Sequence, residues 1–271
     1  MTPAGGAGAT DAALAALPEL RLPTHWQAID FISDLHLSAA MPATHAMWRS
    51  YLAGTPADAV FMLGDLFELW VGDDARVLPF EQACMQTLAQ TATHKSLHFM
   101  VGNRDFLLGP AMLAASGMQA LTEPTMVSAF GTRALLTHGD MWCLDDLPYQ
   151  AFRQLVRSTA WQSTFLAKPL AERLRIAAEI RAHSESRRQF DGAAAADVDP
   201  ATALRWLRGN DASVLIHGHT HRPGSQQLDR GLVRHVLSDW DLDNGSRAEV
   251  LRWSAGGFTR MSPQQAQWPG E

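Results

Sequence analysis

Short runs of apolar residues recur along the chain, and polar residues or glycine follow each of them. Such runs predict buried strands, because a strand that is covered on both faces has few exposed positions. Residues 79–93 and 110–116 lie between these runs and are long enough to form helices. The alternation of strands and helices predicts an α/β protein. The runs occupy residues 28–33, 59–63, 97–101, 134–137 and 213–216.

Two further runs near the end of the chain, at 232–237 and 248–253, predict two more strands. The Asn244-Gly245 pair lies between them and is typical of a turn. We therefore expect either a second sheet or a hairpin-like closure here. Pro200 is expected to open another helix, which extends to about Gly209.

Residues 151–190 differ in charge from the rest of the chain. This segment holds eight Lys or Arg against three Glu, within a protein whose net charge is −6. Its apolar residues recur at helical spacing, which predicts two or three helices inserted into the α/β core. The insertion, at about 150–195, is either an ordinary solvated helical hairpin or a lid over the active site.

The composition narrows the class of protein. A chain of 271 residues that is 46% hydrophobic supports one large domain with a substantial core. Its acidic balance disfavours a nucleic-acid partner. With only Cys84 and Cys143, a disulfide framework or Cys-rich zinc module is excluded, and a reducing compartment fits.

The first part of the chain carries no signal for export. We expect residues 1–24 to be a flexible leader and residues 25–271 to be the folded domain. The leader does not resemble a signal peptide, and no apolar stretch approaches the ~20 residues that span a bilayer. We therefore expect a soluble protein that can still lie on a membrane surface.

Candidate ligands for metal ions follow each of the first five runs directly. The carboxyl ends of strands in open α/β sheets are where binding sites form, so these side chains are expected to converge. The most distinctive segment is His217-Gly-His-Thr-His221, where three imidazoles alternate after an apolar run. His217 shares this pattern, but we do not count it as a ligand. The candidates are Asp34, His36, Asp65, Asn103, His138, His219 and His221.

The number of ligands predicts two metal ions. Seven side chains exceed the four ligands of one tetrahedral ion, and carboxylates mixed with imidazoles suit manganese, iron or zinc. Two neighbouring ions are a device for phosphoryl chemistry. Asp65, alone after its strand, is the natural bridge, and a metal-bound hydroxide is expected to attack phosphorus. Each residue alone has an ordinary explanation as a helix cap, turn or core residue, but five such coincidences at strand ends are improbable.

The order Asp-x-His, Gly-Asp, Gly-Asn-x-Asp, His-Gly and Gly-His-x-His resembles that of the calcineurin-like metallophosphoesterases, from Asp34 to His221. The resemblance implies a four-layer α/β/β/α sandwich. It implies two metal sites that share Asp65 as a bridge. One site then consists of Asp34, His36 and His221, and the other of Asn103, His138 and His219.

One branch of this superfamily is more similar than the others. Many members carry His after the Gly-Asn pair, whereas this chain has Arg104, which can hold phosphate oxygens but cannot donate a proton usefully. The phrases around Asp34, Asp65, Asn103, His138 and His219 resemble the hydrolases of UDP-2,3-diacylglucosamine in lipid A biosynthesis. That resemblance implies Mn²⁺ dependence, and attack on the α-phosphorus to give UMP and an acylated sugar 1-phosphate. It also implies a peripheral place on the cytoplasmic side of a bacterial inner membrane.

The branch also implies contacts with its lipid-linked UDP-sugar. Catalytic roles fall on Asp65, Asn103, Arg104 and His138, and substrate contacts fall on Asn103, Arg104 and His219. Further contacts match Asp146 and Ser184. Where the branch has an Asn and a Lys, this chain has Arg188 and Asp191, so the lysine is absent and either Arg187 or Arg188 is expected to supply the cation instead.

Two alternatives stay open at this stage. The chain could be another dinuclear metallophosphoesterase that acts on a nucleotide or a phosphoprotein. It could also be a scaffold that binds metal or a partner protein without hydrolysis, but such a protein is expected to lose ligands, and all seven are present. We expect no protein partner.

Overall fold

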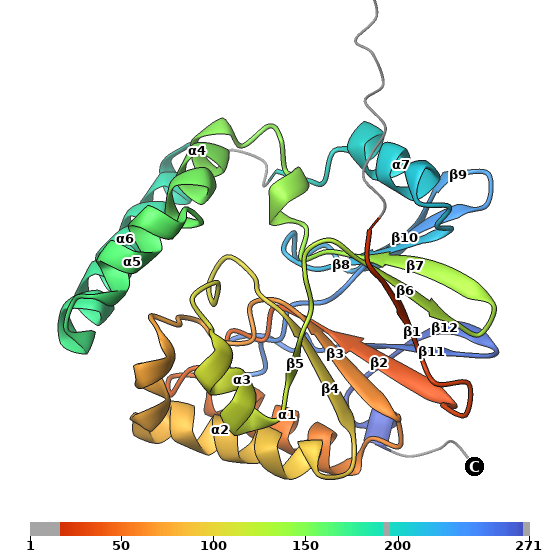
Figure 1. Ribbon diagram of the computed structural model, residues 1–271, viewed down its shortest axis with the longest axis horizontal. Coiled ribbons are helices and arrows are strands. Elements are labelled where there is room, and N and C mark those ends of the chain that lie inside the picture. Colours follow the sequence, from red (N-terminus) through yellow and green to blue (C-terminus); the bar gives the residue numbers. More distant parts are fainter. Residues whose placement is uncertain (1–16, 192–195, 268–271) are drawn as a thin grey trace, which may run out of the picture.

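A computed structural model of the chain describes residues 17–191 and 196–267; the side chains of residues 182–191 lie outside the described part. Two six-stranded sheets pack face to face (Figure 1). The first has the order β1 (Glu19–Arg21), β6 (Thr125–Ala129), β7 (Thr132–Leu136), β8 (Val214–His217), β10 (Leu232–Val236) and β9 (Gly224–Asp229). The second has the order β12 (Gly257–Met261), β11 (Val250–Ser254), β2 (Ala28–Ile32), β3 (Ala59–Leu63), β4 (Ser96–Met100) and β5 (Gln119–Ala120).

The apolar runs divide their side chains between different core layers. Phe31 of β2 and Leu136 of β7 point into the layer between the two sheets. Their neighbours Ile32 and Leu135 point the opposite way, into the layers between each sheet and its helices. Because successive side chains of a strand alternate between faces, a continuous apolar run fills two layers at once.

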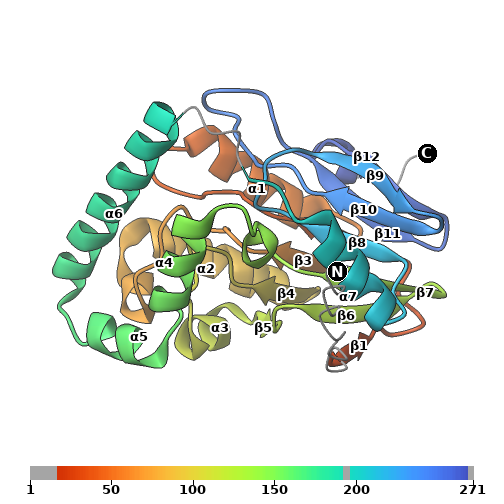
Figure 2. The same ribbon diagram turned by 90° about the horizontal axis from the view of Figure 1, so that it is seen from above.

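Helices cover the outer faces of both sheets. Three helices cover the second sheet, and α7 (Pro200–Gly209) covers the first, so the layers run helix, sheet, sheet, helix (Figures 1 and 2). The predicted four-layer α/β/β/α sandwich is therefore confirmed. The three helices are α1 (Pro42–Gly54), α2 (Pro79–Ala92) and α3 (Pro110–Ser116), and short 3₁₀ turns lie at Asp73–Val77, Asp140–Trp142 and Gln265–Gln267.

The insertion consists of three helices that project from the sandwich (Figure 2). They are α4 (Leu147–Val156), α5 (Thr159–Leu166) and α6 (Leu170–Asp191). The side chain of Asp146 accepts a hydrogen bond from the backbone of Tyr149 and caps α4, and Ser158 caps α5 in the same way. None of the described helices is both long and apolar enough to cross a membrane.

Several predicted elements differ from the structure. Residues 19–21, which we expected in the leader, form β1 and pair with β6. The strands predicted at 232–237 and 248–253 do not form a hairpin with each other. The first, β10, pairs with β8, and the second, β11, pairs with β2 in the other sheet. The chain crosses between the sheets over residues 237–249, where it passes the candidate site.

The topology brings the predicted ligands to one edge. Strands β2, β3 and β4 are parallel neighbours, and so are β7 and β8 in the facing sheet. The loops that follow these five strands therefore meet where the two sheets end together.

Candidate metal centre

Three predicted ligands form the first half of the centre. The Oδ1 atom of Asp34 lies 3.3 Å from Nε2 of His221. Nε2 of His36 lies 3.3 Å from the same His221 nitrogen. Ligand atoms of these three residues all lie within 4.8 Å of one another, which is a spacing that one cation can bridge.

The second half of the centre lies deeper between the sheets. Oδ1 of Asn103 is 3.0 Å from Nε2 of His138 and 2.8 Å from Nδ1 of His219. Oδ1 of Asp65 is 3.7 Å from the same His138 nitrogen. Asp34 also belongs to a group with Asp65 and His138, so Asp34 joins the two halves. Thus the structure brings all seven predicted side chains together, with Asp34 rather than Asp65 common to both three-residue groups.

The backbone at these positions is unusual. Five of the seven candidates adopt positive φ angles between 49° and 66° although none is glycine. This left-handed conformation costs about 1 kcal/mol or more per residue, and such residues concentrate at functional sites. The three histidines of residues 217–221 were expected to alternate along an extended strand. Instead, β8 ends at His217, and His219 and His221 lie in the loop after it. The five are Asp34, His36, Asp65, His219 and His221.

Two histidines are oriented by contacts of the ring nitrogen that faces away from the centre, a hydrogen bond for His138 and an ion-pair contact for His36. Nδ1 of His138 lies 2.8 Å from the carbonyl oxygen of Leu63, and Nδ1 of His36 lies 2.8 Å from a carboxylate oxygen of Glu68. Each contact fixes the proton on Nδ1 and leaves the Nε2 lone pair directed into the centre. This is the tautomer that a metal ligand requires.

The charge of the centre fits cations. Asp34 is completely buried, and its Oδ1 atom has no hydrogen-bond partner. Burial alone would lower the pKa of His138, but the carboxylates of Asp65 and Asp34 outweigh burial and raise it to about 9. Buried, unpaired oxygen ligands beside imidazoles suit divalent ions such as Mn²⁺, Fe²⁺ or Zn²⁺. The residues present therefore fit a pair of metal ions.

Comparison with known proteins places the chain in a family. A family model described as calcineurin-like phosphoesterase matches residues 28–223. The chain belongs to this family. Among curated relatives, a UDP-2,3-diacylglucosamine hydrolase of Chromobacterium violaceum is 43% identical over 242 residues, covering 86% of this chain and 98% of the relative. One of Aromatoleum aromaticum is 42% identical, covering 84% and 93%.

A third relative of the same name, from Bordetella pertussis, is 41% identical and covers 78% of this chain and 85% of its own length. Among solved structures, the phosphoesterase Yfce of E. coli aligns with a TM-score of 0.45 and 15% identity. That alignment covers 88% of this chain and 94% of the other.

In this calcineurin-like phosphoesterase, two carboxylates that sequence reasoning missed position the ligand loops. Asp105 is completely buried and accepts backbone hydrogen bonds from Gly102 at 2.7 Å and Leu66 at 2.7 Å. Glu123 accepts a hydrogen bond from the backbone of His138 at 2.7 Å. Asp105 stands in the quoted Gly-Asn-x-Asp phrase, which could have identified it. Glu123 has no such signal.

His217 is not among the candidate ligands. Its Nδ1 atom lies 2.7 Å from the carbonyl oxygen of Gly218, and its Nε2 accepts a hydrogen bond from Nε of Arg234 at 2.8 Å. Burial and the neighbouring Arg234 lower the pKa of His217 to about 3, so the ring is neutral and both nitrogens are engaged. It supports the loop that carries His219 and His221.

The predicted substrate contacts are distributed unevenly. Arg104 is near the centre, because its backbone N–H donates to Asp65 at 2.8 Å and its guanidinium lies 3.6 Å from Glu68. Asp146 caps α4, where its carboxylate accepts a hydrogen bond from the backbone N–H of Tyr149 at 3.1 Å. Ser184 and Arg188 lie on α6, but their side chains are outside the described part of the structure.

Proposed function

We propose that this phosphoesterase hydrolyses the pyrophosphate of UDP-2,3-diacylglucosamine to UMP and 2,3-diacylglucosamine 1-phosphate with two Mn²⁺ ions, on the cytoplasmic face of a bacterial inner membrane. The observation that carries the proposal is the convergence of all seven candidate ligands in a chain that is 43% identical to a UDP-2,3-diacylglucosamine hydrolase. Mixed carboxylate and imidazole ligands without thiolates are compatible with Mn²⁺, as they are with Fe²⁺ and Zn²⁺.

The side chains divide the work of the reaction. Asp34, His36 and His221 would hold one ion, and Asn103, His138 and His219 would hold the other, with Asp65 beside them. When bound, two such ions supply a water of lowered pKa as the nucleophile and neutralise charge on the phosphate oxygens.

Arg104 is proposed to hold the phosphate group that faces the centre. Its guanidinium is permanently charged and presents several N–H donors in one plane, which matches two phosphate oxygens at once. Glu68 contacts this guanidinium and the Nδ1 atom of His36, so one carboxylate orients both a metal ligand and the phosphate clamp.

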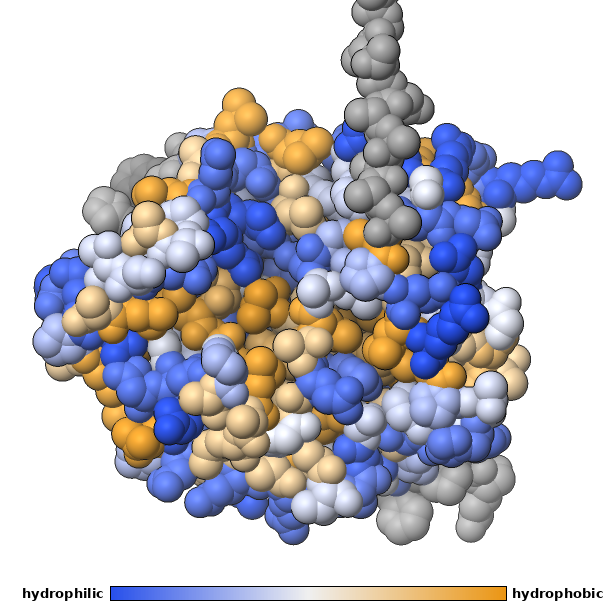
Figure 3. Space-filling view, viewed as in Figure 1, coloured by the Kyte–Doolittle hydropathy of each residue, from blue (hydrophilic) through white to orange (hydrophobic). Residues whose placement is uncertain are grey.

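The insertion supports a lipid substrate. Most of the exposed large apolar side chains among the described residues lie on it or just before it, including Leu147 at 72% and Leu155 at 56% exposure. Figure 3 shows apolar surface between the insertion, at the left of the view, and the core below it. Exposed apolar patches of this kind mark contact surfaces, and a diacylated sugar needs one near the phosphate site.

The net positive charge of the same segment supports a membrane location. Residues 151–190 carry eight Lys or Arg and three Glu, and basic side chains are attracted to anionic lipid headgroups. A surface that is both apolar and basic therefore suits a bilayer from which a lipid substrate is withdrawn.

The deciding experiment compares diacylated UDP-glucosamine with its deacylated form, with and without added Mn²⁺. We expect Mn²⁺-dependent release of UMP from the diacylated compound and at least tenfold lower kcat/KM without the acyl chains. Equal rates on the two compounds would contradict the lipid assignment. Faster turnover of a simple nucleotide or of a phosphopeptide would favour another metallophosphoesterase activity.

A further inference from the structure

We propose that Arg153, on α4 of the insertion, is a positioning residue for the half of the centre formed by Asn103, His138 and His219. The insertion is thereby part of the metal centre and not only a cover for the substrate. This inference rests on the proposed two-ion function.

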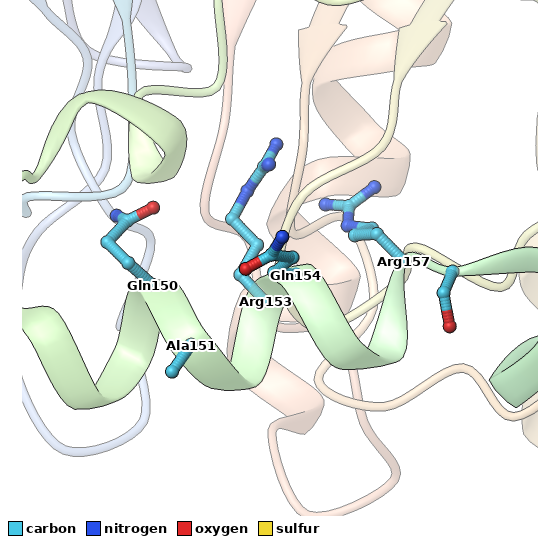
Figure 4. A pocket seen from close by; sticks show the side chains of 6 residues that line it. Gln150, Ala151, Arg153, Gln154 and Arg157 are labelled. Carbon is cyan, nitrogen blue, oxygen red and sulfur yellow. The ribbon is translucent and has the colours of Figure 1, made fainter.

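Arg153 joins two carboxylates of the core. Its Nε atom donates to Oδ2 of Asp140 at 2.8 Å, and its Nη2 atom lies 3.2 Å from Oε2 of Glu123. The side chain is 21% exposed, whereas those of Asp140 and Glu123 are 0% and 8% exposed. Figure 4 shows the guanidinium projecting from α4 on the side away from Ala151. The insertion therefore supplies the cation that neutralises two largely buried anions.

Glu123 carries this contact to a predicted ligand. While Oε2 binds Arg153, Oε1 accepts hydrogen bonds from the hydroxyl of Thr137 at 2.8 Å and from the backbone N–H of His138 at 2.7 Å. The imidazole of His138 in turn lies 3.0 Å from Asn103. Two consecutive contacts thus connect an inserted helix to a candidate ligand in the loop that follows β7.

Among the ion pairs of the described residues, removing the Arg153 cation would leave Glu123 without a charged partner and Asp140 with only the guanidinium of Arg157, at 3.9 Å. A buried carboxylate that loses its charged partner is destabilised, so Glu123 would move from its present position. This movement would displace an acceptor for the backbone N–H of His138. An arginine suits this position because its planar fork serves two carboxylates at the same time, which a lysine ammonium does less well.

The other half of the centre has different supports. His36 is oriented by Glu68, and His221 lies 3.8 Å from Asp239. Among the described residues, the guanidinium of Arg153 forms its ion pairs with Asp140 and Glu123, and neither of these carboxylates belongs to the half formed by Asp34, His36 and His221. Loss of Arg153 should therefore affect one ion and spare the other.

The test is Mn²⁺ binding to the whole protein, measured by calorimetry and by electron paramagnetic resonance. We expect wild type to bind two ions and Arg153→Gln to bind one with unchanged affinity and the other 10- to 100-fold more weakly, as is usual when a group that orients a ligand is lost. Arg153→Lys should fall between them. At saturating Mn²⁺, the kcat of Arg153→Gln should approach the wild-type value.

Two control variants separate this effect from a general loosening of the insertion. Arg173 of α6 is also an insertion arginine that holds the core, but it donates to the carbonyl of Val71 and to Asp74. Arg173→Lys, and Gln154→Ala on α4, should each bind both ions with wild-type affinity.

The outcomes are distinct. Wild-type binding of both ions by Arg153→Gln, or equal weakening of both, would overturn the inference. If Arg153→Gln does not fold, the same criteria apply to Arg153→Lys. A wild-type protein that binds two ions but does not hydrolyse the UDP-sugar would contradict the proposed substrate and leave the metal titration able to decide the role of Arg153.

Discussion

Gly218 packs so closely against the centre that it has no space for a side chain. A Cβ atom at this position would lie 2.2 Å from Oδ2 of Asp34 and 2.3 Å from Oγ of Ser33. The same carboxylate oxygen accepts the backbone N–H of His219 at 2.9 Å. Gly102 is similar, since its Cβ would lie 2.1 Å from Oδ1 of Asp65. The precision of the centre therefore depends on residues that contribute no ligand atom.

Gly218→Ala should displace Asp34 and lower kcat/KM on the order of 100-fold, because misplacement of a catalytic group by ~1 Å has this effect. Gly224→Ala is the matched control, since a Cβ there meets nothing within 4 Å. Steady-state release of UMP from diacylated UDP-glucosamine would measure both. Unchanged kinetics in Gly218→Ala would show that Asp34 can shift without loss of function.

At the scale of whole elements, one buried ion pair joins the second sheet to its helices. The carboxylate of Asp30 on β2 is fully buried and binds Nε and Nη2 of Arg252 on β11 at 2.7 and 2.8 Å. It also accepts hydrogen bonds from Tyr51 on α1 at 2.9 Å and from Thr55 at 2.7 Å. Removing only the cation leaves a buried carboxylate without its charged partner.

Arg252→Met should therefore lower the free energy of unfolding by about 3–5 kcal/mol. Adding Asp30→Asn should restore much of this loss, because the neutral amide no longer needs the cation and can still bond to Tyr51. Urea unfolding of Arg252→Met, of Asp30→Asn and of the double variant gives the coupling free energy between Asp30 and Arg252. If the double variant were as unstable as the sum of the single changes, the pair would not act as a unit.

The strands that the sequence predicts correctly are those covered by other parts of the protein on both faces of the sheet. β3 is buried at all five positions, so composition alone revealed it. β9 has mostly exposed residues and lies at a sheet edge, so its pattern resembles a loop. The pairing of β10 and β11 with different sheets depends on contacts between distant segments, which local sequence does not encode.

The candidate site shows the same division. The convergence of its candidate ligands could be predicted because Asp, Asn and His directly follow apolar runs. The role of Glu123 could not be predicted. It accepts a backbone N–H group, and no sequence motif around it indicates that contact. The sequence presents Arg153 only as one of several basic residues in 151–190, because its partners Glu123 and Asp140 cannot be identified from local pattern.

For the molecule as a whole, stability depends on a neutral histidine between the sheets. His98 of β4 is 4% exposed and stacks on Phe61 with ring centroids 4.3 Å apart. Trp26 lies on another side at 6.5 Å. Burial lowers the pKa of His98 to about 4. The unfolded chain, with a pKa near 6.5, therefore binds a proton more readily than the folded protein between these two values.

The free energy of unfolding should accordingly fall as the pH decreases from about 6.5 to 4, by up to about 3 kcal/mol from this residue. His98→Phe should keep the aromatic stacking and flatten the pH dependence in that range. The surface variant His94→Gln should leave the slope unchanged. Chemical unfolding at several pH values would measure all three proteins, and an unaltered slope in His98→Phe would contradict the assignment.

The five left-handed ligand residues have a consequence for directed evolution of this enzyme. A side chain with a Cβ is strained at each of these positions, whereas glycine there would relax the backbone. Selection for heat resistance in the absence of metal would reward such replacements and erase the reactive centre first. A library screened for durability should therefore be expressed in medium rich in divalent metal ions, where ions bound at the centre would make the strained candidate ligands advantageous.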